Sequence, residues 1–167
     1  MEIAGKIASY FQGSPAELIT VIIAMLPVAE LRGAIPWALT LGDLDWTRAI
    51  PLAIVGNMIP IPFILLLLGP VSNFLSRWAV FEKFFQWLFA RTRKRSKNIE
   101  RYKALGLILF VAIPLPVTGG WTGSVAAFLF GIRFWKAMIC VFIGVCIAAV
   151  IVSLTTLGAI GAVRLFG

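Results

Sequence analysis

The stretch LPVAELRGAIPWALTLG, residues 26–42, returns 89 residues later as LPVTGGWTGSVAAFLFG, residues 115–131. When the chain is aligned with itself at this shift, residues 18–69 and 107–158 share 13 identities in 52 positions without a gap. Matches of Leu and Ile are common between any two apolar segments, whereas matches of Pro, Gly and Trp are not. The informative pairs are Pro27 with Pro116, Gly42 with Gly131, Trp46 with Trp135, and Gly69 with Gly158. The chain is therefore predicted to contain two related halves.

The composition is that of an integral membrane protein. Of its 167 residues, 60% are hydrophobic and 13% are charged, with a mean hydropathy of +0.98. Soluble domains have about 45–50% apolar and about 25% charged residues. The chain contains no histidine, which excludes His-dependent hydrolysis and His-rich metal sites, and we expect neither a metal nor a cofactor. We interpret the net charge of +8 as a sign of membrane topology rather than of nucleic-acid binding.

Four apolar runs divide the chain. Ala49–Gly69 and Ala137–Ala162 carry no charge and are long enough to cross a membrane. Ala16–Gly42 and Ala104–Gly131 are interrupted by proline and glycine. We expect an all-α integral membrane fold in a single domain, residues 1–167, with a first repeat at about 16–69, a central segment at 70–103 and a second repeat at about 104–162.

The central segment has two parts. Pro70–Ala90 places aromatic residues on one helical face, which predicts an amphipathic helix lying in the membrane interface; a fifth crossing is the alternative. Residues 91–103, RTRKRSKNIERYK, hold seven Lys or Arg and one Glu. Such a run is typical of a cytoplasmic loop, and it could also bind anionic lipid headgroups. We expect a multi-pass protein of the plasma membrane with this loop in the cytoplasm.

The interrupted runs decide how the chain crosses the membrane. Ala16–Ala29, at 14 residues, would be about 21 Å long as a helix, less than the roughly 30 Å of a hydrocarbon core. Each interrupted run either crosses once as a kinked helix or folds as a re-entrant hairpin that enters and leaves on one side. The breaks favour hairpins, because free backbone groups at membrane depth need protein or a wet cavity around them. The prolines at these breaks are Pro27, Pro36, Pro114 and Pro116.

With hairpins, each half crosses the membrane once, so the second half is inverted relative to the first, as in many secondary transporters. Charge does not separate the two arrangements, since in both of them eleven Lys or Arg lie on the side of the basic loop and three on the other. They differ over the termini, which lie outside the cell with hairpins and inside it with kinked crossings.

Glu30 and Arg32 are charged residues set between apolar stretches. On a regular helix, side chains two residues apart do not face each other, so both reach one cavity only if the backbone is opened. An ionisable group inside a membrane segment marks by default a transport pathway or proton relay. We expect Glu30 to couple transport to protons and Arg32 to bind a phosphate or carboxylate through its planar guanidinium. A structural salt bridge is the alternative.

The second break offers uncharged ligand groups. Thr118, Gly119, Gly120 and Thr122 combine hydroxyl groups with backbone that a ligand can approach. N-termini of half-helices there could direct N–H groups at an anion. We therefore place these residues in the predicted substrate site with Arg32, although a glycine-rich tight turn would show the same pattern.

Asn57 lies in the uncharged run Ala49–Gly69, close to Pro60 and Pro62. This combination suggests a kinked helix that lines a cavity, and Asn57 joins the predicted substrate site. An interhelical hydrogen bond is the alternative role for its side chain.

Three motifs, ELRGAIPWAL (residues 30–39), GNMIPIPFILLLLG (56–69) and FVAIPLPVTGGWTG (110–123), resemble those of the small multidrug export proteins of bacteria and archaea. That family is grouped with the DedA (VTT-domain) superfamily, and the resemblance covers nearly the whole chain. It implies two re-entrant hairpins that face each other in inverted orientation. It also implies transport, in DedA relatives of polyprenyl-phosphate carriers or other lipids, with proton coupling proposed.

Carried onto this chain, the acidic residue of the first hairpin in that family matches Glu30, with Arg32 close behind. The second hairpin departs from DedA proteins, which have arginines beside the proline, because Ile113–Gly123 contains none. Arg32 would then act with backbone amides of the second break.

We expect a transporter or flippase for an anionic lipid or isoprenoid phosphate, coupled to protons. Export of cationic hydrophobic drugs in exchange for protons is the second hypothesis. A non-transporting assembly or lipid-organising factor that acts through the basic loop is the third. No nucleophile–base motif or metal set appears, so no enzyme and no catalytic residue is predicted. The expected partners are membrane lipids, an anionic lipid or other small-molecule substrate and a proton, without nucleic acid; a homodimer is one assembly open to the chain.

Overall fold

The computed structural model describes residues 14–75, 97–115 and 118–166, and every regular element in these ranges is a helix. Most of the predicted interfacial helix, the basic loop as far as Ser96, and Pro116 lie outside the described residues. The rest of the predicted loop, residues 97–103, is helical, which corrects that part of the prediction. The helices are α2 (Ala16–Met25), α3 (Glu30–Thr40), α4 (Trp46–Met58), α5 (Pro60–Leu75), α7 (Lys97–Ala112), α8 (Gly120–Leu129) and α9 (Phe134–Phe166).

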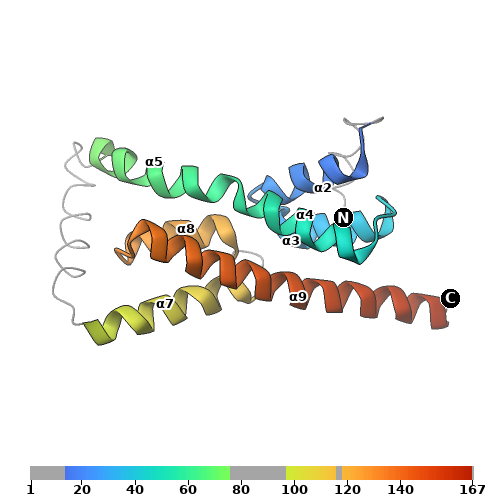
Figure 1. Ribbon diagram of the computed structural model, residues 1–167. Helices are drawn as coiled ribbons and strands as arrows, with labels where there is room; N and C mark the ends of the chain where they lie inside the picture. The colour runs from blue at the N-terminus through green and yellow to red at the C-terminus, as the bar shows by residue number, and fades with distance from the viewer. Residues whose placement is uncertain (1–13, 76–96, 116–117, 167) are drawn as a thin grey trace.

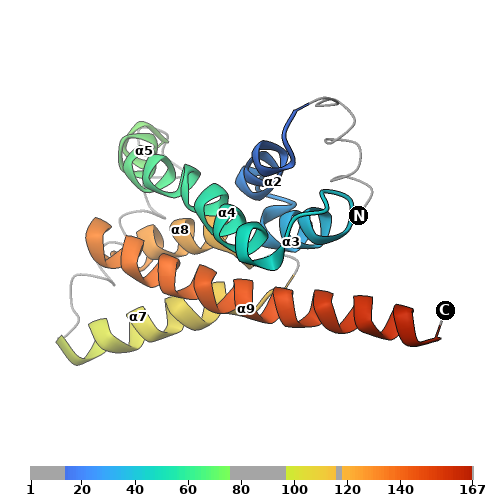
Figure 2. The same cartoon turned by 45° about the vertical axis from the view of Figure 1, so that its right-hand side comes forward.

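Both halves have the same order of elements. In each half, a helix, a break and a second short helix are followed by a tight turn and a long helical segment. Moved by 89 residues, the bounds of α3 become 119–129, and α8 occupies 120–129. In Figure 1, α2 and α3 lie side by side in the right half of the molecule, and α7 and α8 in the left half. The segment α4–α5 runs in the opposite direction to α9 in both Figure 1 and Figure 2.

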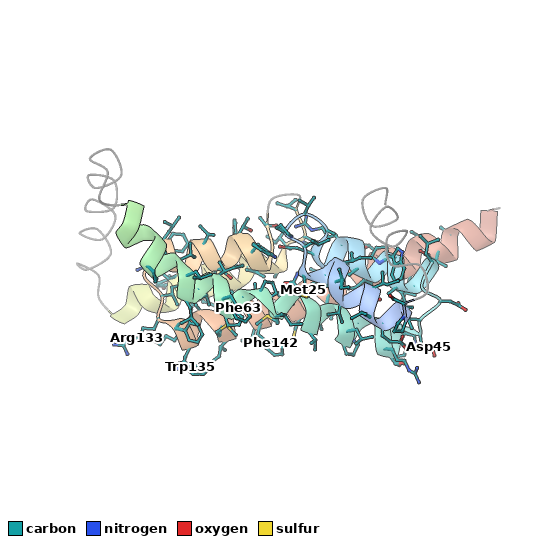
Figure 3. The ribbon with its side chains drawn as sticks, turned by 90° about the horizontal axis from the view of Figure 1, so that it is seen from above. Met25, Asp45, Phe63, Arg133, Trp135 and Phe142 are labelled. Carbon is teal, nitrogen blue, oxygen red and sulfur yellow. The ribbon has the colours of Figure 1, made fainter. Side chains whose placement is uncertain are left out.

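The turns of the two halves lie at opposite ends of the molecule. Figure 3 shows Asp45, which precedes α4, at one end and Arg133, which precedes α9, at the other, with Met25 between them. The tips of the two helix pairs therefore point toward the middle.

The contacts between helices follow the repeat, in which α2, α3 and α4–α5 correspond to α7, α8 and α9. Within the halves, α2 packs against α4 and α7 packs against α9; between the halves, α3 packs against α9 and α8 against α5. Glycine allows the close approach of α4 to α2, since a Cβ at Gly56 would lie 2.6 Å from the carbonyl oxygen of Val21. Small residues at such crossings are typical of helix packing in membranes.

Among the residues that the structure describes, two helical segments are long and apolar enough to cross a membrane, Trp46–Pro70 and Phe134–Ala162. They contain the two uncharged runs predicted as crossings. Large apolar side chains on them are exposed, among them Phe63, Leu66, Phe142 and Leu154, and Figure 3 shows Phe63 and Phe142 on the outer surface. A contiguous apolar surface of this kind fits contact with lipid, so the protein is an integral membrane protein.

The first crossing is interrupted at Ile59, between α4 and α5. Pro60 and Pro62 lack the N–H groups that would bond to the carbonyls of Gly56 and Met58, which accounts for the interruption. The predicted kink near Asn57 is therefore present.

The start of the predicted interfacial helix at Pro70 is wrong. Pro70 lies inside α5, which continues without a break to Leu75. The residue before Pro70 is Gly69, and without a Cβ it avoids part of the clash that usually excludes helical backbone before proline.

Candidate functional site

The two breaks meet at a small cavity between the halves. The first half contributes Glu30, Leu31 and Arg32 from α3 and Asn57 from α4. The second half contributes Pro114, Thr118 and Gly119 from its break, Gly120 from α8, and the apolar side chains of Val111, Val145, Ala148 and Val152. Glu30, Arg32, Asn57, Thr118, Gly119 and Gly120, all predicted from the sequence as site residues, thus lie together.

The backbone at Glu30 brings both charged residues to the cavity. Glu30 is the first residue of α3 and has a φ of 45°, in the left-handed region that non-glycine residues rarely adopt. On regular helix its side chain and that of Arg32 would not share a face, whereas here both line the cavity. Such strain persists only where the surrounding structure imposes it, and it is enriched at functional sites.

The carboxylate of Glu30 lies at the N-terminus of α8. The side chain is only 6% exposed, and its Oε1 accepts a hydrogen bond from the backbone N–H of Trp121 at 3.4 Å. The backbone N–H of Gly120 also faces it. A Cβ at position 119 would overlap this carboxylate, so a larger residue there would require the Glu30 side chain to move. The carboxylate thus occupies the positive end of a helix of the opposite half.

Arg32 and Trp121 join the two breaks. Nη2 of Arg32 donates to the carbonyl of Thr118, and Nε1 of Trp121 donates to the carbonyl of Met25 at 3.0 Å. Arg32 and Trp121 occupy equivalent positions in the repeat, 89 residues apart. Each side chain therefore bonds to the backbone of the other half. Sequence reasoning missed Trp121, although its alignment with Arg32 was a signal that could have found it.

The predicted alternative of a salt bridge between Glu30 and Arg32 is not what the structure has. No nitrogen–oxygen distance between these two side chains falls within 4.0 Å, and the ion pair described in residues 14–75 joins Arg48 and Glu17 at the surface. A guanidinium has five N–H donors, and the structure describes one of those of Arg32 in use.

Asn57 has one satisfied and one unsatisfied side-chain group. The residue is fully buried, and its Nδ2 donates weakly to the carbonyl of Ala24 at 3.4 Å, which is the interhelical hydrogen bond considered above. Its Oδ1 has no hydrogen-bond partner among the described residues. A buried polar atom without a partner costs about 1–3 kcal/mol, so a donor is expected to reach it in some state of the protein.

Other predicted residues lie outside the cavity or at its edge. Thr122 does not line it, which corrects its placement in the substrate site: it belongs to the first turn of α8, and its hydroxyl donates to the carbonyl of Gly119 at 3.4 Å. Pro27 is exposed at the tip of the first break, and Pro36 lies inside α3. Of the prolines at the second break, Pro114 lines the cavity and Pro116 is outside the described residues.

The cavity has room for about one water molecule. It is lined by one carboxylate, one guanidinium, one unsatisfied amide oxygen, Thr118 and the N-terminus of a helix, with apolar side chains around them. Such a set can bind a proton or an anionic group. In the arrangement described, nothing larger than water fits.

Residues 30–151 match a protein family described as "Putative small multi-drug export protein". This range begins at Glu30, directly after the first break, and includes α3, the second break and the first part of α9. Because it covers well over half of the chain, the protein belongs to this family. No curated protein and no solved structure shows significant similarity to the chain.

Proposed function

We propose that this member of the small multidrug export family is a proton-coupled transporter of an anionic amphiphile, such as a lipid or isoprenoid phosphate. The observation that carries the proposal is the pairing of Arg32 with the α8 N-terminus around one buried cavity. Both groups favour a negative charge, and an anionic headgroup would find them together in the membrane interior.

In this proposal α2–α3 and α7–α8 are re-entrant hairpins that enter from opposite sides, which makes the halves an inverted repeat. The antiparallel course of α4–α5 and α9 supports it, as do the two turns at opposite ends of the molecule. The protein lies in the plasma membrane with the basic loop in the cytoplasm, and this places the termini outside. The grouping with the DedA superfamily, which would imply the same plan, stays a prediction.

Transport requires the hairpins to separate, because the cavity has room for about one water molecule and none for a headgroup. The bonds from Arg32 to Thr118 and from Trp121 to Met25 hold the breaks together in this state. A phosphate that competes for Arg32 would weaken the first of them. Glu30 exchanges a proton during the cycle, so that a pH gradient drives the movement.

The test is transport in liposomes that contain a polyprenyl phosphate, whose appearance in the outer leaflet is followed by hydrolysis with an external phosphatase. We expect wild-type protein to move the lipid faster with a pH gradient. Arg32→Gln should be about 10- to 100-fold slower, since a hydrogen bond to a charged group contributes about 1.5–3 kcal/mol. Arg48→Gln, which removes an exposed arginine, is the matched control. An Arg32→Gln protein as fast as wild type would overturn the proposal.

Export of cationic drugs is the second candidate, favoured by the family to which residues 30–151 belong. In that case Glu30 exchanges a proton for the drug, and Glu30→Gln should abolish protection of cells while Arg32→Gln should not. The guanidinium beside the carboxylate favours the anionic substrate. A non-transporting factor acting through the basic loop would tolerate both substitutions.

A further inference from the structure

Glu30 occupies the place that an anionic ligand would take. Its carboxylate accepts a hydrogen bond from the N–H of Trp121, faces the N–H of Gly120, and lies near enough to Arg32 to be attracted by its charge. Two backbone donors and a nearby cation, all suited to an oxyanion, therefore surround a carboxylate of the protein itself. An external anion cannot use the amide donors while this carboxylate holds them.

Asn57 offers a second hydrogen-bonding position for the side chain of Glu30. A Cβ at Gly119 would meet Glu30, and a Cβ at the next residue, Gly120, would meet Oδ1 of Asn57, so the carboxylate and this oxygen lie beside adjacent residues. Oδ1 is a buried acceptor without a donor. An ionised carboxylate has no donor to give it, whereas a protonated carboxyl group has one.

We propose that the ionised carboxylate of Glu30 is a built-in occupant of the α8 anion site, and that an anionic substrate replaces it when Glu30 takes up one proton and donates it to Oδ1 of Asn57. This inference rests on the proposed function and specifies its coupling: the proton and the anion bind together rather than in exchange. Asn57 is then a positioning residue that holds the protonated form of Glu30 away from α8.

The surroundings leave Glu30 as the group that gains the proton. Arg32 from α3 is the other ionisable residue on the described cavity wall and remains a cation. The wall from α4 contributes the amide of Asn57, and that from the second break and α8 contributes Pro114, Thr118, Gly119 and Gly120. The walls from α7 and α9 contribute only valine and alanine side chains.

The experiment measures proton uptake when a fixed-charge anion binds. Octylsulfonate is added to the full-length protein in nanodiscs in weak buffer, with octanol as the uncharged control, and pH and bound probe are both recorded. Because the sulfonate does not titrate between pH 5 and 8, any proton taken up belongs to the protein. We expect about one proton per bound probe, and probe affinity that rises by up to about tenfold for each unit of falling pH.

Two variants with matched controls separate the role of Glu30 in proton uptake from the positioning role of Asn57. Glu30→Gln should bind the probe without proton uptake and with little pH dependence, while Glu17→Gln should behave as wild type. Asn57→Cys, which introduces the residue found at the equivalent position 146, should bind the probe more weakly with the pH dependence reduced. Ser153→Ala, which changes a buried polar side chain outside the cavity, should bind the probe as wild type does.

The outcomes distinguish this inference from the proposed function. Binding to wild type without proton uptake, or with proton release, would overturn the coupling and leave an anion site in place. Unchanged uptake in Glu30→Gln would show that another group takes the proton, which also overturns it. Wild-type protein that binds octylsulfonate no better than octanol would overturn the anion site itself, and the proposed function with it.

Discussion

Glu30 shows how a single residue can combine a local penalty with a long-range role. Its φ of 45° is unfavourable for a non-glycine residue, by about 1–2 kcal/mol. The same backbone directs its carboxylate to α8 of the other half and allows Arg32 to face the same cavity. The residue types and the need for an opened backbone could be predicted from the sequence. The position of the carboxylate on α8 could not, because it depends on how two breaks 89 residues apart meet.

A substitution at Gly119 tests the position of the Glu30 carboxylate at the N-terminus of α8. In Gly119→Ala the new Cβ overlaps the Glu30 carboxylate, so we expect loss of transport and destabilisation by about 1–3 kcal/mol. Unfolding in mixed micelles and the liposome assay provide the measurements. Gly106→Ala is the control, because a Cβ at that helical glycine meets nothing within 4 Å. Equal tolerance of the two substitutions would contradict the described contact.

At the scale of elements, the sequence predicts some of the helix bounds and breaks but not all of them. The breaks, the two crossings and the interruption near Asn57 follow from proline positions and apolar length. The extension of α5 through Pro70 does not, since the glycine before the proline relaxes a rule that usually ends helices. Trp121 was also missed, because tryptophan in an apolar segment is most often interpreted as packing.

Trp121→Phe removes the indole hydrogen bond to Met25, one of the bonds that join the breaks. We expect a loss of roughly 0.5–1.5 kcal/mol in stability, the usual contribution of one neutral hydrogen bond. If that bond holds the closed state, spin labels on the two tips should also report a larger separated population. Trp135→Phe is the matched control, since that indole is exposed at the start of α9. A variant indistinguishable from this control would argue against a role for the Trp121–Met25 bond.

Gly56 tests the packing of α4 on α2. Gly56→Ala places a methyl group 2.6 Å from the Val21 carbonyl oxygen, and we expect destabilisation by about 1–3 kcal/mol. Gly158→Ala makes the same change in α9, where nothing lies within 4 Å, and should be neutral or stabilising by up to about 1 kcal/mol. Both values come from unfolding in mixed micelles. Destabilisation of equal size in the two variants would contradict the role assigned to the close approach of α4 to α2.

At the scale of the whole molecule, the proposed site depends on two related halves that meet at their breaks. The repeat was visible in the sequence, and the helix bounds follow it closely. Trp46 and Trp135, at the starts of α4 and α9, are both exposed, as expected for anchors at the two membrane interfaces. Neither the charge distribution nor the helix lengths decide between hairpins and kinked crossings, since both place the basic loop in the cytoplasm.

Position 133 separates the two arrangements directly. Hairpins place the turn at Arg133 in the cytoplasm, on the side of the basic loop, whereas kinked crossings place it outside; Asp43 is outside in both. Single cysteines at these positions, with Cys140 and Cys146 replaced by serine, are labelled in intact cells with a membrane-impermeant maleimide. We predict that Asp43→Cys is labelled and Arg133→Cys is labelled only after the membrane is opened. Labelling of both in intact cells would contradict the inverted hairpins, and with them the shared site at Glu30.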